Sequence, residues 1–147
     1  IDVGKTFDEA VALFPDMTFK VRNECHELEV MSDSLLRQLF YNLIDNTGKY
    51  GKKATTMRIY YEKAETDNLA LVYEDDGVGI SEENKSKVFQ EGFSTGGSTG
   101  FGLFLIKKMI DVYNWAIQET GTPNKGVQFI ITIPRKNYDE NESYIIN

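Results

Sequence analysis

The stretch of sequence that decides the fold is Leu71-Val72-Tyr73-Glu74-Asp75-Asp76-Gly77-Val78-Gly79-Ile80. Its first residues continue an apolar run over 69–73, which predicts a buried β-strand. Three acids and two glycines follow within the next six residues, and glycine lets a backbone turn sharply or approach another group closely. Asp-Gly is also a common pair in ordinary turns, so this stretch alone is open to both interpretations: a ligand-binding turn and a plain one.

Upstream of this strand and turn, residues 33–49 have the periodicity of an amphipathic helix. Its apolar stripe consists of Leu35, Leu36, Leu39, Phe40, Leu43 and Ile44. We expect the helix to open at Ser32-Asp33 and to end between Gly48 and Gly51. A glycine inside a helix costs about 1 kcal/mol, so the helix is expected to loosen at Gly48.

The polar side of the same helix carries Gln38, Asn42, Asn46 and Lys49. Residues four apart lie one above the other, so Asn42 and Asn46 present two amides to the same space. Amide oxygens coordinate a hard cation such as Mg²⁺ without adding charge, and Mg²⁺ completes its shell with water and substrate phosphates. A lysine one turn further on would meet phosphate as a point charge. Taken alone, this pattern is equally typical of a solvated helix face.

A second glycine-rich segment lies between residues 90 and 102, and its serines and threonines separate Gly92, Gly96, Gly97, Gly100 and Gly102. It leads directly into an apolar helix predicted over residues 103–113. Backbone N–H groups at a helix start form a phosphate-binding site, and flexible glycines suit a lid that closes over a ligand. The alternative is a disordered loop with a glycine-rich helix start.

The rest of the chain completes an α/β pattern. Thr6 is expected to cap a first helix that includes Phe7 and Phe14 and stops at Pro15. Further elements are expected as strands over 19–25, 28–31, 57–61, 115–120 and 127–133, and as a short helix over 82–88. Strands that follow one another in hairpins predict a two-layer α/β sandwich, with a mixed sheet covered on one face by helices. We expect one domain over residues 1–134 and a charged, frayed tail over 135–147.

Composition excludes several classes of protein. The chain has 147 residues, 41% of them hydrophobic, and a net charge of −7. So acidic a chain is a poor partner for nucleic-acid phosphates. We see no apolar run long enough to span a membrane and no signal peptide, and a single cysteine fits a reducing compartment. We therefore expect a cytoplasmic domain without nucleic-acid or membrane contact and, since no initiator Met is present, a piece of a longer chain.

Three motifs in order resemble the catalytic, ATP-binding domain of sensor histidine kinases, which share a superfamily with type II topoisomerases, Hsp90 and mismatch-repair ATPases. They are Asn42 to Asn46 with Lys49-Tyr50, then Asp75 to Ile80, then Gly100 to Leu103. Phe89 and Phe93 are similar to the phenylalanine box of that family. The resemblance covers residues 1–134 and implies a Bergerat-type ATP-binding fold and a transferase active in two-component signal transduction.

The resemblance also implies roles for single residues. Asn46 would bind Mg²⁺, Asn42 would support metal and phosphates, and Lys49 would contact phosphate. Asp75 would recognise adenine. The remaining implied nucleotide contacts are Tyr50, Gly77, Gly79, Ile80, Phe89, Thr99, Gly100, Phe101, Gly102 and Leu103.

Asn42 separates the branches of the superfamily. Hydrolysing members usually carry a glutamate at this place, which acts as a base towards water. An asparagine cannot take a proton, so it favours transfer of the γ-phosphate to a neutral imidazole. The alternative is a nucleotide-sensing pseudokinase that binds ATP without transfer, which the short lid and its lack of basic residues keep open.

The phosphate acceptor is expected elsewhere. His26 is the single histidine and is followed by Glu27-Leu28, as in many phosphoacceptor sites. It falls in a predicted turn between strands rather than on a dimerising helix, so we interpret it as an exposed turn residue. The implied partners are a separate histidine-containing dimerisation domain upstream and, indirectly, a response-regulator receiver domain.

Overall fold

The computed structural model describes residues 1–51, 53–93 and 102–140. Its main sheet has the strand order β1-β3-β4-β6-β5. These strands are β1 (Lys20–Asn23), β3 (Thr56–Lys63), β4 (Leu69–Asp75), β6 (Gln128–Ile133) and β5 (Ala116–Glu119). β1 runs parallel to β3 and the other pairs are antiparallel, which makes the sheet mixed.

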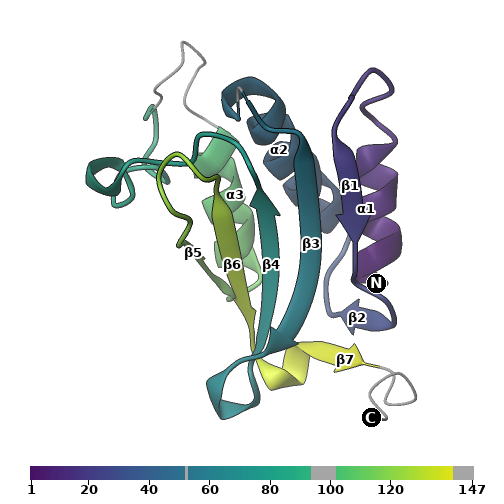
Figure 1. Ribbon diagram of the computed structural model, residues 1–147. Helices are drawn as coiled ribbons and strands as arrows, with labels where there is room; N and C mark the ends of the chain where they lie inside the picture. The colour runs from purple at the N-terminus through teal and green to yellow at the C-terminus, as the bar shows by residue number, and fades with distance from the viewer. Residues whose placement is uncertain (52, 94–101, 141–147) are drawn as a thin grey trace.

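Three helices cover one face of this sheet (Figure 1): α1 (Val3–Val11), α2 (Leu35–Tyr50) and α3 (Gly102–Val112). Alternate strand residues such as Ile59, Leu71 and Phe129 are fully buried beneath them. Burial of every second strand residue is typical of a sheet that packs against a single layer of helices. The predicted α/β sandwich with a mixed sheet and one covered face is confirmed.

The predicted amphipathic helix is α2. Its apolar stripe from Leu36 to Ile44 is buried, and Asp33 Oδ1 accepts a hydrogen bond from Leu35 N at 3.0 Å near the start of the helix. The helix ends at Tyr50, and Gly51 is its C-cap, within the expected range. It does not stop at Gly48, since the helix continues through that residue to Tyr50. Packing of the stripe therefore outweighs the low helix propensity of that glycine.

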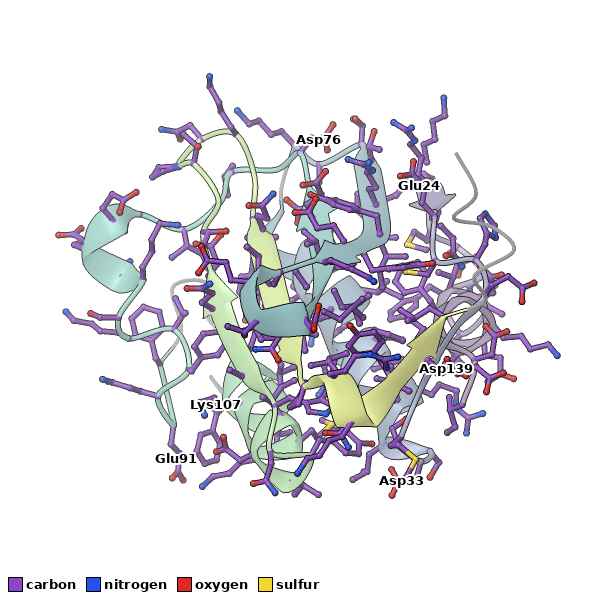
Figure 2. The ribbon with its side chains drawn as sticks, turned by 90° about the horizontal axis from the view of Figure 1, so that it is seen from below. Glu24, Asp33, Asp76, Glu91, Lys107 and Asp139 are labelled. Atoms are coloured by element: carbon purple, nitrogen blue, oxygen red, sulfur yellow. The ribbon has the colours of Figure 1, made fainter. Side chains whose placement is uncertain are left out.

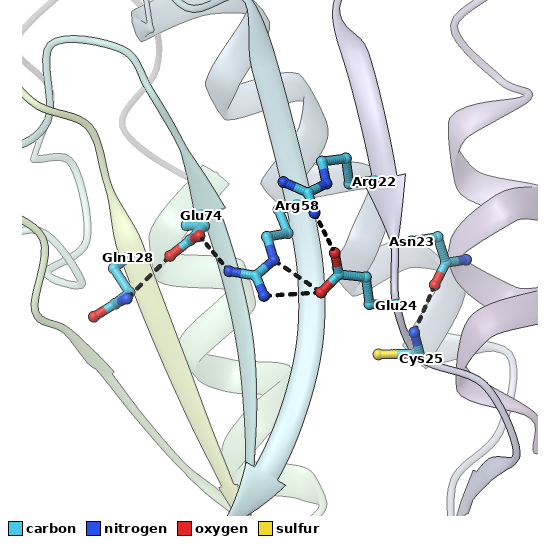
Figure 3. Close-up of polar contacts among 7 residues, drawn as sticks. All are labelled: Arg22, Asn23, Glu24, Cys25, Arg58, Glu74 and Gln128. Carbon is cyan, nitrogen blue, oxygen red and sulfur yellow. Dashed lines mark hydrogen bonds and ion pairs between the residues drawn. The ribbon is translucent and has the colours of Figure 1, made fainter. Parts of the chain in front are cut away.

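The uncovered face of the sheet carries a row of paired charges, which Figure 3 shows across four segments. Arg58 donates to Glu24 Oε1 at 2.8 and 3.0 Å and to Glu74 Oε1 at 3.3 Å. Arg22 and Gln128 add one hydrogen bond each, to Glu24 and Glu74. The hydrogen bonds from Arg58 hold the pKa of Glu24 below its usual value. Because these charges satisfy one another, this row stabilises strand order and offers no free charge to a ligand.

The first helix begins earlier than expected. Asp2, not Thr6, is its N-cap, and the Asp2 carboxylate accepts from Lys5 N at 2.9 Å. Thr6 lies inside the helix, where its hydroxyl donates to Asp2 O at 2.8 Å. The expected cap at Thr6 was wrong because an acid four residues upstream supplies the acceptor first.

Two other local expectations were also wrong. The strand pair 19–25 and 28–31 exists as separate strands, but β1 pairs with β3 while β2 (Leu28–Val30) pairs with β7 (Tyr138–Glu140). The chain between β1 and β2 therefore is not a hairpin turn. Residues 82–88 do not form an α-helix either: only Glu82–Asn84 is helical, as a 3₁₀ turn.

Part of the segment expected to be a frayed tail is ordered. Arg135–Asn137 forms a 3₁₀ turn, and β7 follows it and completes a small sheet with β2. Tyr138 is 5% exposed, and its hydroxyl donates to Asp67 O. The division of the chain into a domain over 1–134 and a tail remains a prediction, but residues 135–140 pack on the domain.

Replacing Tyr138 by alanine should lower the free energy of unfolding by about 3 kcal/mol, because a buried ring and its hydrogen bond are lost. Urea denaturation followed by circular dichroism measures this. Lys136→Ala, an exposed neighbour, serves as the control and should change stability by less than about 0.5 kcal/mol. A Tyr138→Ala loss as small as the control would mean that β7 does not contribute to the fold.

Candidate functional site

The carboxylate of Asp75 lies at the end of β4 and is 9% exposed. Oδ1 accepts hydrogen bonds from Gly77 N at 2.9 Å and Val127 N at 3.1 Å, and Oδ2 accepts one from Thr47 Oγ1 at 2.8 Å. A buried charge is tolerated only with such partners. Asp75 is therefore joined to the first glycine turn, to β6 and to α2 at once.

Its neighbour Asp76 points elsewhere. The Asp76 carboxylate accepts from Thr55 N at 2.7 Å, Thr56 N at 3.0 Å and Thr55 Oγ1 at 2.7 Å. Figure 2 shows Asp76 on the side of the molecule opposite to Asp33, which precedes α2. Of the two adjacent acids, only Asp75 faces the helical layer.

Thr47 is a site residue that the sequence motifs missed. It is 1% exposed, and its Oγ1 lies 2.6 Å from Tyr73 Oη as well as 2.8 Å from Asp75 Oδ2. Burial raises the pKa of Tyr73 above its usual value, so this phenol keeps its proton. The signal was available in the sequence: Thr47 follows Leu36, Phe40 and Leu43 at helical spacing, which places a hydroxyl within an apolar stripe.

The first glycine turn is built by contacts between loops. A Cβ on Gly77 would lie 2.5 Å from Gly51 O, and one on Gly79, whose φ is +70°, would lie 2.8 Å from Gly126 O. Val78 N donates to Gly51 O at 3.2 Å, and Val78 O accepts from Asn124 N at 2.7 Å. These glycines are thus required where three backbone segments meet, and their contact with a purine ring remains a prediction.

The amides of α2 lie on one face of that helix, as expected. Asn42 Oδ1 accepts from Gln38 Nε2 at 3.0 Å, while Asn42 Nδ2 is buried without a hydrogen-bond partner. Asn46 is half-buried one turn later. Lys49 is exposed and lies 3.0 Å from Asp45, which raises the pKa of Lys49. Lys49 is therefore engaged on its own helix in this structure.

Some of the remaining residues predicted to contact the nucleotide lie within the described part of the chain and others lie outside it. The hydroxyl of Tyr50 is buried without a partner, and Ile80, Phe89 and Leu103 are half-buried against the core. The Phe89 ring centroid lies 6.2 Å from that of Phe129. Gly102 begins α3, and within the described ranges nothing lies within 4 Å of its Cβ position. Thr99, Gly100 and Phe101 lie outside the described residues.

A buried ion pair anchors the segment that leads towards the second glycine run. The Lys85 ammonium donates to Glu119 and to Gly121 O, and the Glu119 side chain is fully buried. Glu119 Oε2 also accepts from Gly121 N at 2.9 Å and Gln128 N at 3.0 Å. The ion pair therefore attaches residues 81–88, which form no α-helix, to the β5–β6 hairpin. The sequence motifs did not reveal this ion pair.

Comparison with known families agrees with this geometry. Residues 31–137 match the model of the family described as histidine kinase-, DNA gyrase B-, and HSP90-like ATPase. The chain belongs to this family. The match includes α2, both glycine-rich segments and β4, which carries Asp75, and it shows that the chain is an ATP-binding domain.

Individual relatives of the chain are sensor proteins. The sensor protein SrrB of Staphylococcus aureus is 28% identical over 92% of this chain, and the sensor protein CiaH of Streptococcus pneumoniae is 30% identical over 85% of it. The chain spans 26% and 30% of the lengths of these two relatives. It therefore corresponds to one domain of such proteins, the catalytic domain of the histidine kinase type.

Solved structures show the same fold. The nucleotide-free catalytic domain of histidine kinase ThkA superposes with a TM-score of 0.74 at 27% identity, over 92% of this chain and 93% of that one. The mycobacterial sensor histidine kinase MprB gives a TM-score of 0.77 at 19% identity, over 96% and 97% of the two chains.

No helix within the described ranges is long and apolar enough to cross a membrane.

Two glycine-to-alanine exchanges should have opposite effects. Gly77→Ala should destabilise the domain by about 1–3 kcal/mol, because the new methyl group meets the backbone of Gly51. Gly48→Ala is the matched control: nothing lies within 4 Å of its Cβ position, so it should stabilise α2 by up to about 1 kcal/mol. Urea denaturation of both variants checks the pair, and an unharmed Gly77→Ala would refute the loop contact.

Proposed function

We propose that this domain binds Mg²⁺–ATP and donates the γ-phosphate to a histidine on a separate dimerisation domain, as the catalytic half of a two-component sensor kinase. The observation that carries the proposal is the amide face of α2. It presents Asn42 Nδ2, a buried donor that has no partner in the described part of the chain, where hydrolytic relatives would carry a carboxylate. A buried unpaired donor is unfavourable, and a phosphate oxygen would satisfy it.

The described residues fit the two ligands. Asp75 offers an acceptor to the exocyclic amine of adenine, and Tyr50 Oη is a second buried donor without a partner. The metal site would rest on the amide oxygen of Asn46, which suits a cation that keeps most of its ligands from water and phosphate. Among the described residues no cluster of three His, Cys, Asp or Glu side chains could hold a metal by itself. Bound Mg²⁺ would neutralise charge on the phosphates.

The lack of a free carboxylate on α2 supports transfer of the γ-phosphate rather than hydrolysis of ATP. Asp45 is the single carboxylate within α2, and it lies 3.0 Å from Lys49. The Asn42 amide cannot accept a proton from water. A neutral imidazole attacks phosphorus through its own lone pair and needs no base to activate it. The chain would thus position the γ-phosphate and stabilise its charge, and the acceptor would supply the nucleophile.

The acceptor and the later partners belong to the proposal as well. His26 is exposed between β1 and β2, and its backbone oxygen accepts from Tyr61 Oη at 3.0 Å. It lies on no helix, so it does not resemble a phosphoacceptor. We propose an upstream helical domain as the acceptor, a response-regulator receiver domain as the next recipient, and a cytoplasmic location for this domain.

A pseudokinase that binds ATP without transfer is the second candidate. The observation that favours it is the Lys49–Asp45 pair, which turns the expected phosphate-binding ammonium onto its own helix. An exposed pair of this kind contributes at most about 1 kcal/mol, so a bound phosphate can displace Asp45 from Lys49. The two candidates differ in transfer and not in binding.

Incubation of this domain and its helical neighbour domain with γ-labelled ATP should label a histidine on the neighbour. The label should be stable in alkali and labile in acid, as a phosphoramidate is. The neighbour domain with that histidine replaced by glutamine is the control and should remain unlabelled. ATP binding without any label on the neighbour would select the pseudokinase.

Asn46→Ala should weaken ATP binding about tenfold or more in the presence of Mg²⁺ and leave the weaker binding in EDTA unchanged, because it removes a metal ligand. Isothermal titration calorimetry in both buffers measures the difference. Arg37→Ala, an exposed substitution on the same helix, is the control. Equal affinities of Asn46→Ala and the parent in Mg²⁺ would refute the metal role of Asn46.

A further inference from the structure

The hydroxyl groups of Tyr73 and Thr47 form a line that ends on Asp75. Thr47 Oγ1 lies 2.6 Å from Tyr73 Oη and 2.8 Å from Asp75 Oδ2, and all three side chains are buried. An ionised carboxylate only accepts, so the single Thr47 hydrogen is donated to Asp75. Tyr73 can then donate to Thr47 Oγ1, and the sulfur of Met57 at 3.1 Å is its weaker alternative acceptor.

Burial fixes the direction of this line. Because the pKa of Tyr73 is raised by burial, the phenol stays protonated and acts as a donor. At 2.6 Å the Thr47 oxygen is the nearer and stronger acceptor than the Met57 sulfur at 3.1 Å, so each hydroxyl gives its one hydrogen to the next oxygen, and hydrogen bonds in such chains polarise one another. Thr47 is thereby a stronger donor to Asp75 than an isolated hydroxyl.

Counting acceptor sites shows what remains for a ligand. A carboxylate has about four lone-pair positions. Oδ1 uses two of them for Gly77 N and Val127 N, and Oδ2 uses one for Thr47. Among the described residues no donor takes the fourth position, on Oδ2, in a carboxylate whose orientation is fixed by donors from three different segments.

We propose that Thr47, polarised by Tyr73, is a positioning residue that makes Asp75 selective for a purine with an exocyclic amine. The inference rests on the proposed role of Asp75 in nucleotide binding. An amine donates to the one free position on Oδ2. A purine with a carbonyl at the same place sets lone pair against lone pair, and the fixed carboxylate cannot turn away or present a donor instead.

Removal of the Thr47 hydroxyl should relax this selectivity rather than abolish binding. The Asp75 carboxylate would keep its two backbone donors, but Oδ2 would have two open positions that water could occupy. A bridging water can donate to a carbonyl or accept from an amine, so amine and carbonyl purines would bind more nearly alike. If Thr47 had a purely structural role, removal of its hydroxyl would instead lower the affinity for both nucleotides by the same factor.

Calorimetry with ATP and inosine triphosphate, which differ at that exocyclic group, tests the proposal. The parent domain is measured first. If it does not bind ATP, the proposed function fails; if it binds both nucleotides equally, the role of Asp75 fails. In a parent that prefers ATP, Thr47→Val should reduce the ratio of the two affinities about tenfold, the effect of losing one hydrogen bond to a charged group.

Two further variants separate positioning from packing. Thr47→Ser retains the hydroxyl and should restore most of the ratio that Thr47→Val loses, although it removes a methyl group. Tyr73→Phe removes only the first hydroxyl of the line and should reduce the ratio by a smaller factor, about threefold. Urea denaturation shows that each variant is folded. An unchanged ratio in Thr47→Val, or in Tyr73→Phe if Thr47→Val does not fold, would overturn the proposal.

Discussion

The rest of the structure depends on the burial of one carboxylate. Asp75 is accommodated in the interior because α2, the first glycine turn and Val127, which precedes β6, each give it a hydrogen-bond donor. Leaving such a group without partners costs several kcal/mol, a large share of the stability of a domain this size. The buried carboxylate is therefore stable only with these three segments around it, and the fold fixes the acceptor that the proposed ligand would use.

The same edge of the sheet brings three backbone segments together without intervening side chains. Gly51 at the end of α2, Gly77 after β4 and Gly126 before β6 lie so close that a methyl group on Gly77 or Gly126 would overlap backbone atoms. Contacts of this kind depend on the lengths and positions of the elements that precede them. The apolar stripe of α2, the buried apolar run of β4 and the alternation in β6 set those positions, so the core determines the geometry of the site.

Local patterns in the sequence were sufficient for α2, β3, β4 and the β5–β6 pair, because their periodicity is set by one face that must be buried. They were insufficient for β2, whose partner β7 lies more than a hundred residues away, because no local pattern encodes such a pairing. The site divides similarly. Glycines and amides could be recognised as motifs. The helical spacing of Thr47 indicates that it is buried, but its hydrogen-bond partners Tyr73 and Asp75 appear only when helix and sheet are packed together.

The negative net charge of the domain is compatible with the mostly neutral groups that α2 offers to a nucleotide in the proposed complex. A chain with net charge −7 repels a polyanionic nucleotide at long range, although screening limits this to about 8 Å at physiological salt. Within the site, Lys49 is neutralised by Asp45, and the remaining contacts on α2 are amides and a phenol. In the proposed complex the positive charge would come from the metal, which arrives with the nucleotide. Affinity would then follow the free Mg²⁺ concentration, and an acidic surface that deters other polyanions would remain compatible with binding this one.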